Sequence, residues 1–157
     1  METNNKNSEA NIPSIIIGKL MNVGGILQRE GNRLLLPFNL NQQQFSILFE
    51  IAKAGEVQQK NMVNRLVLEK AHVSKVVKKL NVMGLIHINN KPDDKRSALL
   101  SATDKGKQVV EDCRGVFQQW NNDWYELYSN DELLQILDSV GKLQNLFKRK
   151  IAKPNIL

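Results

Sequence analysis

One stretch decides how this chain folds: residues 70–80, which read KAHVSKVVKKL. Its apolar residues recur at positions i, i+3, i+4 and i+7, the spacing that gathers side chains on one face of an α-helix. These apolar residues are Val73, Val76, Val77 and Leu80. The opposite face is expected to carry Ala71, Ser74, Lys75 and Lys78, with His72 and Lys79 at its flanks. The stretch therefore predicts a helix that packs by its valines and offers polar and cationic side chains outward.

The positive charge of the chain is concentrated around this helix. The 157 residues carry a formal net charge of +6. Residues 57–100 contain nine Lys or Arg and three acids, whereas the rest of the chain contains 13 basic and 13 acidic residues. Confinement of the excess to one segment is the pattern expected of a surface that binds a polyanion such as nucleic acid. The alternative is a lysine-rich face that is only solvated.

Short elements on both sides of the helix complete a motif. A short helix is predicted from about Gln58 to Leu66, and residues 85–88 and 98–101 are strand-like runs around a polar loop at 89–96. Two short helices followed by a two-stranded hairpin with a basic tip form a winged helix-turn-helix. We therefore predict a mainly α fold with a small β-hairpin wing.

Longer helices are predicted outside this lobe. One covers residues 15–36 and ends at Pro37, and the next opens with a capping box, Asn41 with Gln44, and ends at Gly55.

The two helices expected after the wing carry large apolar side chains. Thr103 caps the first of them, which runs to about Tyr128, and Ser129 with Glu132 caps the last. The bulkiest apolar side chains are Phe117, Trp120, Trp124 and Phe147. A small lobe cannot cover the helices at both ends of the chain, so these faces need a partner surface.

We therefore expect a homodimer. The expected organisation is a disordered tail at 1–11, dimerisation and core helices at 12–56, the winged DNA-binding lobe at 57–103 and C-terminal dimerisation helices at 104–152, together one compact domain. A two-fold pair would present two copies of the 70–80 helix about 34–36 Å apart, one turn of DNA. The alternative is a monomer whose end helices form a core of their own.

The tip of the hairpin holds a second group of functional candidates. Asp94 stands two residues before Arg96. A carboxylate at that spacing can fix the guanidinium in one pose, and an arginine so held suits insertion into a narrow minor groove. The alternative is a surface ion pair within the loop.

Residues 57–106 resemble the MarR family of bacterial regulators. The family's wing signature, Asp-x-Arg followed by a strand and Thr-x-x-Gly, is matched by Asp94 to Arg96 and by Thr103 to Gly106. The helix-turn-helix pattern is matched at Leu66, Leu68, Lys70, Val73, Ser74, Val77, Leu80 and residues 84–86. The chain departs from the family at Gln58, Ala71 and Ala102, which affects local caps and base reading rather than the fold.

The resemblance implies a sequence-specific, double-stranded DNA-binding regulator of transcription. It implies a ligand-responsive repressor that acts as a homodimer on a pseudo-palindromic operator and responds to a small aromatic or anionic effector. It also implies that Arg96, oriented by Asp94, enters the minor groove. The side chains implied for the major groove are Lys70, His72, Ser74, Lys75 and Lys78. The alternatives are a winged-helix protein-interaction module and an RNA-binding protein.

Other classes of function find no support in the sequence. No catalytic, nucleotide-binding or metal-binding motif is present, so we predict no enzyme, no catalytic residue, no cofactor and no metal site. The single cysteine, Cys113, lies on the apolar face of a predicted helix, where a redox-sensing thiol is not expected. Trp120, Trp124 and Tyr125 are candidates for a ligand pocket, although aromatic stripes more often belong to a core. No apolar run nears the roughly 18 residues that span a bilayer, and the polar N-terminus lacks a secretory signal, so we expect a cytoplasmic protein without a membrane partner.

Overall fold

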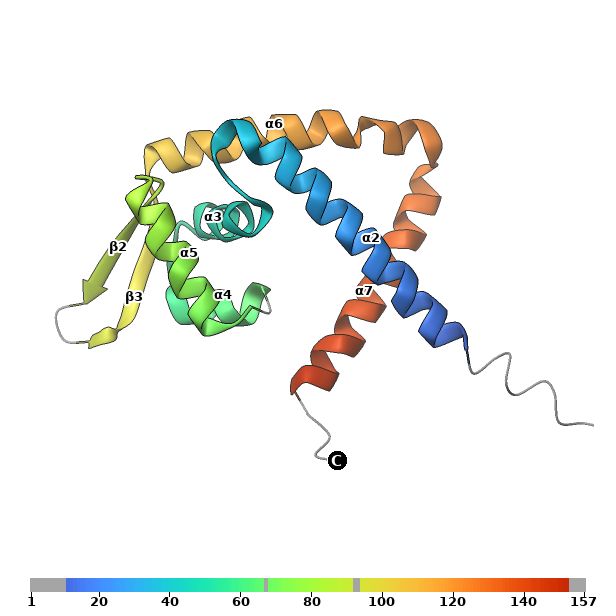
Figure 1. Cartoon of the computed structure of the whole chain (residues 1–157), viewed down its shortest axis with the longest axis horizontal. Helices are drawn as coiled ribbons and strands as arrows, with labels where there is room; N and C mark the ends of the chain where they lie inside the picture. The colour runs from blue at the N-terminus through green and yellow to red at the C-terminus, as the bar shows by residue number, and fades with distance from the viewer. Residues whose placement is uncertain (1–10, 67, 92–93, 153–157) are drawn as a thin grey trace, which may run out of the picture. The chain divides into compact units, whose positions relative to one another are not determined.

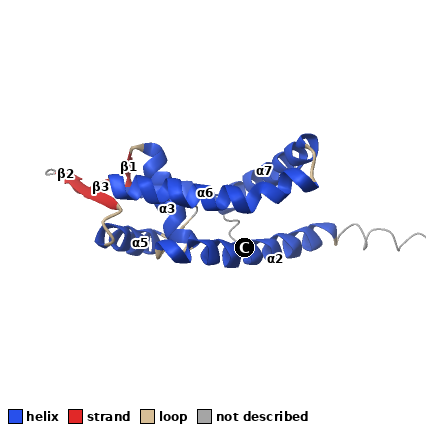
Figure 2. Ribbon diagram, turned by 90° about the horizontal axis from the view of Figure 1, so that it is seen from above, coloured by secondary structure: helices blue, strands red, loops and turns tan. Residues whose placement is uncertain are grey.

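The computed structural model describes residues 11–66, 68–91 and 94–152, although the side chains of residues 64, 90–91, 94–97 and 152 are not part of this description. The tail predicted at 1–11 therefore lies outside the described residues, except for Asn11. The chain divides into two compact units, residues 1–116 and 117–157. Figure 1 colours the helices and strands of both by residue number. The described part is mainly helical with one small sheet, as predicted (Figure 2).

The second helix begins and ends where local sequence signals place it, whereas the first begins three residues before the predicted start at residue 15. Helix α2 covers Ile12–Leu35 with a proline in its first turn, and a 3-10 turn, η1, follows at Leu36–Phe38. Helix α3, Gln42–Ala54, opens with the predicted capping box. The Asn41 side chain accepts from the backbone N–H of Gln44 at 2.8 Å, and the Gln44 side chain accepts from the backbone N–H of Asn41 at 3.0 Å. The backbone N–H groups of Asn41 and Gln44, which have no partner within the helix, are thereby hydrogen-bonded.

The helix-turn-helix consists of α4, Gln59–Leu66, and α5, Lys70–Val82. Gly55 closes α3 and Gly84 follows α5, each with a φ of +72°, a conformation that glycine adopts without steric cost. Helix α3 therefore ends at a residue whose backbone does not continue a helix, as predicted for Gly55, and such a residue follows two positions after the end of α5.

The sheet has three antiparallel strands, one more than predicted. Strands β1 (Glu56–Gln58), β2 (Ile86–Lys91) and β3 (Asp94–Ala102) lie in the order β1-β3-β2. The prediction of a two-stranded hairpin with a loop at 89–96 was wrong in extent, because both strands continue into that polar stretch. Cross-strand backbone hydrogen bonds hold the ribbon there, so the side chains need no apolar alternation.

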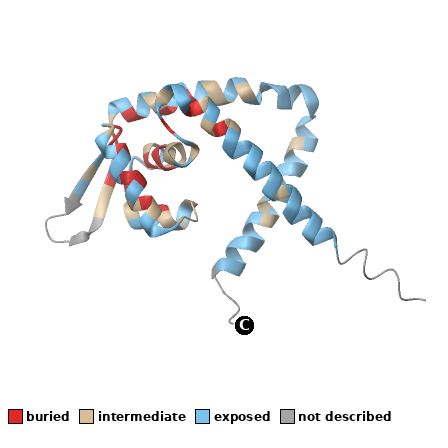
Figure 3. Cartoon of the chain, in the orientation of Figure 1, coloured by how far each residue is buried: buried red, intermediate tan, exposed pale blue. Residues whose placement is uncertain are grey.

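The core of the first unit lies where α3, α5, the sheet and the start of α6 (Asp104–Leu127) meet (Figure 3). Its fully buried side chains are Leu35, Ile47, Leu48, Ile51, Met62, Val73, Val77, Leu80, Ile86, Leu100 and Cys113. These residues come from both ends of the unit's sequence. The winged lobe is therefore packed on α3 and α6 rather than tethered to them.

Two long helices complete the described part of the chain. Helix α6 covers Asp104–Leu127 and crosses the boundary between the units, and α7 covers Asn130–Ala152. Ser129 caps α7 as predicted, because its backbone N–H donates to the Glu132 carboxylate at 2.8 Å and its hydroxyl accepts from the Glu132 backbone at 3.4 Å. Within the described residues, no helix is long and apolar enough to cross a membrane.

Candidate nucleic-acid interface

Helix α5 is amphipathic in the orientation that the sequence predicted. Its apolar side is locked into the core, since Val73 and Leu80 have no exposed surface and Val77 only 1%. The opposite side is exposed at Lys70, Ala71, Lys75, Lys78 and Lys79. Rotation of the helix would bury lysines and expose valines, so the lysines are fixed on the outside.

These lysines have no charged partner within the part of the chain that the structure describes. The ion pairs found there include none with Lys70, Lys75, Lys78 or Lys79. Arg65 of α4, by contrast, lies with its Nη1 3.5 Å from Oε2 of Glu50 on α3. The outer face of α5 is thus a cluster of cations whose countercharge is left to solvent or to a bound polyanion.

Ser74 lies at the edge of this face rather than fully outside. It is half-buried, and its Oγ accepts a hydrogen bond from Nε2 of Gln59 at 2.9 Å. Gln59 is the first residue of α4, so this bond joins the two helices of the motif. Gln59 was not predicted as part of the site, because no local pattern indicates a contact between residues 15 positions apart.

His72 is less available than its predicted place at the flank suggests. It is half-buried, and its Nε2 is covered with no hydrogen-bond partner among the described residues. Contact between Nε2 and an external group would require the ring to turn. The other predicted residues of α5 are placed as expected, with Lys70, Lys75 and Lys78 exposed.

The wing is anchored firmly at its base. Thr103 donates from its hydroxyl to the carbonyl oxygen of Gly84 at 2.8 Å, and the Thr103 Oγ accepts from the backbone N–H of Gly106 at 2.9 Å. The backbone N–H of Thr103 donates to Leu85 at 3.1 Å. A Cβ on Gly106 would overlap the Leu85 carbonyl oxygen, so only glycine allows this approach. The Thr-x-x-Gly signature therefore joins the end of β3 and the start of α6 to the end of α5.

The tip of the wing carries the two remaining predicted residues, Asp94 and Arg96. Both lie in β3, which pairs with β2 from Ile86↔Ala102 out to Lys91↔Asp94. The side chains of Asp94 and Arg96 lie outside the described part of the chain. Orientation of Arg96 by Asp94 therefore stays a prediction.

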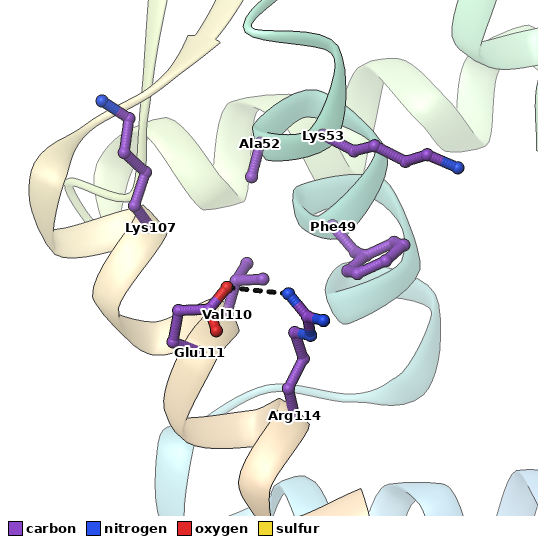
Figure 4. A pocket seen from close by; sticks show the side chains of 7 residues that line it. All are labelled: Phe49, Ala52, Lys53, Lys107, Val110, Glu111 and Arg114. Atoms are coloured by element: carbon purple, nitrogen blue, oxygen red, sulfur yellow. Dashed lines mark hydrogen bonds and ion pairs between the residues drawn. The ribbon is translucent and has the colours of Figure 1, made fainter. Parts of the chain in front are cut away.

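A cleft of about 440 Å³ opens between α3 and α6 within the first unit (Figure 4). Its lining residues are Phe49, Ala52, Lys53, Lys107, Val110, Glu111 and Arg114. Nη1 of Arg114 lies 3.0 Å from Oε1 of Glu111, whereas Lys53 and Lys107 extend away from the centre of the cleft. The cleft thus has apolar walls from Phe49 and Val110 and a cationic rim.

Cys113 lies in an environment that disfavours its thiolate form. Its side chain is fully buried, and burial raises the pKa of the thiol to about 11, with a further contribution from the carboxylate of Asp112. The reactive form of cysteine is the thiolate, which such a pKa suppresses at neutral pH. Among the described residues, no group of three His, Cys, Asp or Glu side chains could hold a metal ion.

Comparison with known proteins gives one consistent relationship. Residues 40–98 match the model of the MarR family. The HTH-type transcriptional regulator BilQ of Clostridioides difficile is 24% identical over 114 residues, which cover 73% of this chain and 77% of BilQ.

Two crystal structures illustrate the similarity of fold. A putative MarR family transcriptional regulator from Listeria monocytogenes, complexed with a 26mer DNA, has a TM-score of 0.79 at 21% identity and covers 90% of this chain and 96% of that one. CouR from Rhodococcus jostii RHA1, bound to p-coumaroyl-CoA, has a TM-score of 0.71 at 23% identity and covers 90% and 94%. The winged helix fold expected from the sequence is confirmed.

Proposed function

We propose that this chain, which belongs to the MarR family, binds double-stranded DNA as a homodimer and represses transcription until a small effector releases it. The observation that carries the proposal is the outer face of α5. There, exposed lysines without a charged partner among the described residues stand on a helix whose other face is immobilised in the core. A rigid cationic helix of this kind fits a major groove.

Each candidate residue has a role in this proposal. Lys70, Lys75 and Lys78 neutralise phosphates or contact base edges, and Ser74 hydrogen-bonds a base edge. His72 contributes only if its ring turns. Arg96, oriented by Asp94, enters the minor groove. The DNA complex of the Listeria monocytogenes regulator supports this placement by analogy of fold.

Exposed apolar faces support the homodimer. On α2 the exposed apolar side chains are Ile12, Ile15, Ile16, Ile17, Met21, Val23, Ile26 and Leu27. On α7 they are Leu134, Ile136, Leu137, Val140, Leu146, Phe147 and Ile151. A second copy of the chain offers the same apolar patches, and a two-fold axis brings them together. The pair presents two copies of α5 to one duplex.

The cleft between α3 and α6 is the proposed effector site. Its volume lies within the range of small-molecule pockets, which is roughly 300–1,000 Å³. Apolar walls and a cationic rim favour a ligand with an anionic group and an apolar body. CouR, with p-coumaroyl-CoA bound, is a protein of the same fold that holds a small molecule. Alanine at Lys53 and Lys107 should weaken binding of aromatic carboxylates without changing duplex binding in their absence.

We propose a regulatory rather than an enzymatic role, in the cytoplasm of a bacterial cell. BilQ is a transcriptional regulator, and the described residues supply a binding face rather than a set of reacting groups. A protein-interaction module or an RNA-binding protein would use the same fold. Neither alternative accounts for a lysine face and the Asp94–Arg96 signature in one lobe.

The test is selection of bound fragments from random DNA duplexes, followed by gel shifts with the selected site. Lys75→Ala and Arg96→Ala should weaken binding about tenfold each, as expected for loss of a phosphate or groove contact. Lys142→Ala is the matched control, because this lysine lies on α7 and pairs with Asp138 at 2.6 Å. Equal binding by all variants, or no duplex binding by wild type, would refute DNA reading by this surface. Retention of RNA or a protein without duplex binding would favour the alternatives.

A further inference from the structure

The surface proposed to read DNA includes a side chain from outside α5. Gln59, at the start of α4, reaches across to Ser74 in the second turn of α5, and Nε2 lies 2.9 Å from Oγ. Both residues are half-buried, between the core and the exposed lysine face. The bond therefore lies at the edge of the proposed reading surface, between α4 and α5.

The direction of this hydrogen bond limits what Ser74 can offer. A serine hydroxyl has one O–H donor and two lone pairs, and the Gln59 amide group donates into one of those lone pairs. The O–H of Ser74 is then not needed for Gln59 and is free to point elsewhere. One lone pair remains beside the O–H, so the bond from Gln59 halves the capacity of Ser74 to accept hydrogen bonds and leaves its capacity to donate intact.

We propose that Gln59 is a positioning residue for sequence recognition, which holds Ser74 so that its hydroxyl is presented to DNA as a donor. The inference rests on the proposed DNA-binding function. Ser74 then prefers a base edge with an acceptor, such as N7 or O6 of guanine or O4 of thymine, over the amino group of cytosine or adenine. Base preference at one position of each half-site is thus set jointly by α4 and α5.

The substitution that tests this polarity is Gln59→Glu. Glutamate has nearly the same shape, but its carboxylate only accepts hydrogen bonds. Ser74 must then donate its O–H to the carboxylate of residue 59. Only the lone pairs of the Ser74 hydroxyl remain for a base, so Ser74 can act there only as an acceptor. Selection from random duplexes should move the preference at one base pair per half-site from an acceptor toward a donor, by about fivefold in relative affinity, the worth of one hydrogen bond.

A double variant separates positioning from direct contact. Ser74→Ala should abolish the preference at the same base pair, and Gln59→Glu added to Ser74→Ala should then change no preference. Asn61→Asp is the matched control for charge, since Asn61 is an exposed residue of the same helix. It should weaken binding to all duplexes alike without moving the preference. Thermal unfolding of each variant verifies that the fold is intact.

The outcomes distinguish the two proposals. Unchanged base preference in Gln59→Glu, or a shift that persists in the Ser74→Ala background, overturns the positioning role while leaving DNA binding in place. Wild-type protein that selects no sequence overturns the proposed function and the inference together. A shift at one base pair that depends on Ser74 supports both.

Discussion

The outer faces of α5 and α2 are both exposed, but they differ in what they lack. On α5 the lysines have no countercharge among the described residues, whereas on α2 the half-exposed isoleucines and Val23 have no apolar cover. The kind of group that each face lacks indicates the chemistry of the surface that would bind it. A polyanion suits the first face and a second apolar surface suits the other.

The largest effect is expected from a charge placed in the exposed apolar face of α2. Val23→Glu places a charge in the middle of α2, where Val23 is 50% exposed in the single chain. The chain alone tolerates the charge, but burial of an unpaired carboxylate in a symmetric interface costs about 3–5 kcal/mol per subunit. Sedimentation should show conversion of dimer to monomer, with loss of operator binding.

Gln28→Glu is the matched control for Val23→Glu. It adds the same charge to the same helix at an exposed position that lies about 140° around the helix axis from Val23. This variant should remain dimeric. If Val23→Glu also stays dimeric, the exposed apolar side of α2 is not the dimer interface.

The next largest effect is expected at the junction between the end of α5 and the start of α6. Gly106→Ala forces a Cβ against the carbonyl oxygen of Leu85, and the backbone there is held by Thr103. We expect a loss of about 3 kcal/mol in the free energy of unfolding, because backbone cannot move aside as a flexible side chain can. Thermal or denaturant unfolding measures it.

A second glycine of the same helix gives the contrast. Gly115 has open space around its added Cβ, so Gly115→Ala should stabilise α6 by about 0.5–1 kcal/mol through helix propensity. Equal effects of the two substitutions would show that propensity, rather than the close approach to Leu85, explains Gly106.

The sequence predicted the helices better than it predicted the contacts between them. Capping boxes at Asn41 and Ser129 are local signals, and the structure confirms both. Strand β1 was missed because three residues carry no periodicity, and its existence depends on pairing with β3 more than 40 positions away. The core face of α5 followed from a repeat within 11 residues.

Contacts across elements account for what sequence reasoning missed at the candidate site. The bond from Gln59 to Ser74 and the covered Nε2 of His72 both depend on how α5 packs against its neighbours. Helical periodicity assigns a direction to a side chain but not a partner. The exposure of the lysines follows from their direction on the helix alone and not from a contact with another element, so it could be predicted from the sequence.

The smallest effect is expected from the loss of one lysine charge on the outer face of α5. Lys78→Ala removes one cation per subunit from the exposed face of α5. If each Lys78 neutralises one phosphate, the slope of log affinity against log salt should become shallower by about 2 for the dimer, and affinity at moderate salt should fall roughly tenfold. Fluorescence anisotropy across a salt series measures both quantities. Lys142→Ala makes the same change of charge on α7, so an equal change of slope in that variant would mean that net charge, rather than the face of α5, attracts the duplex.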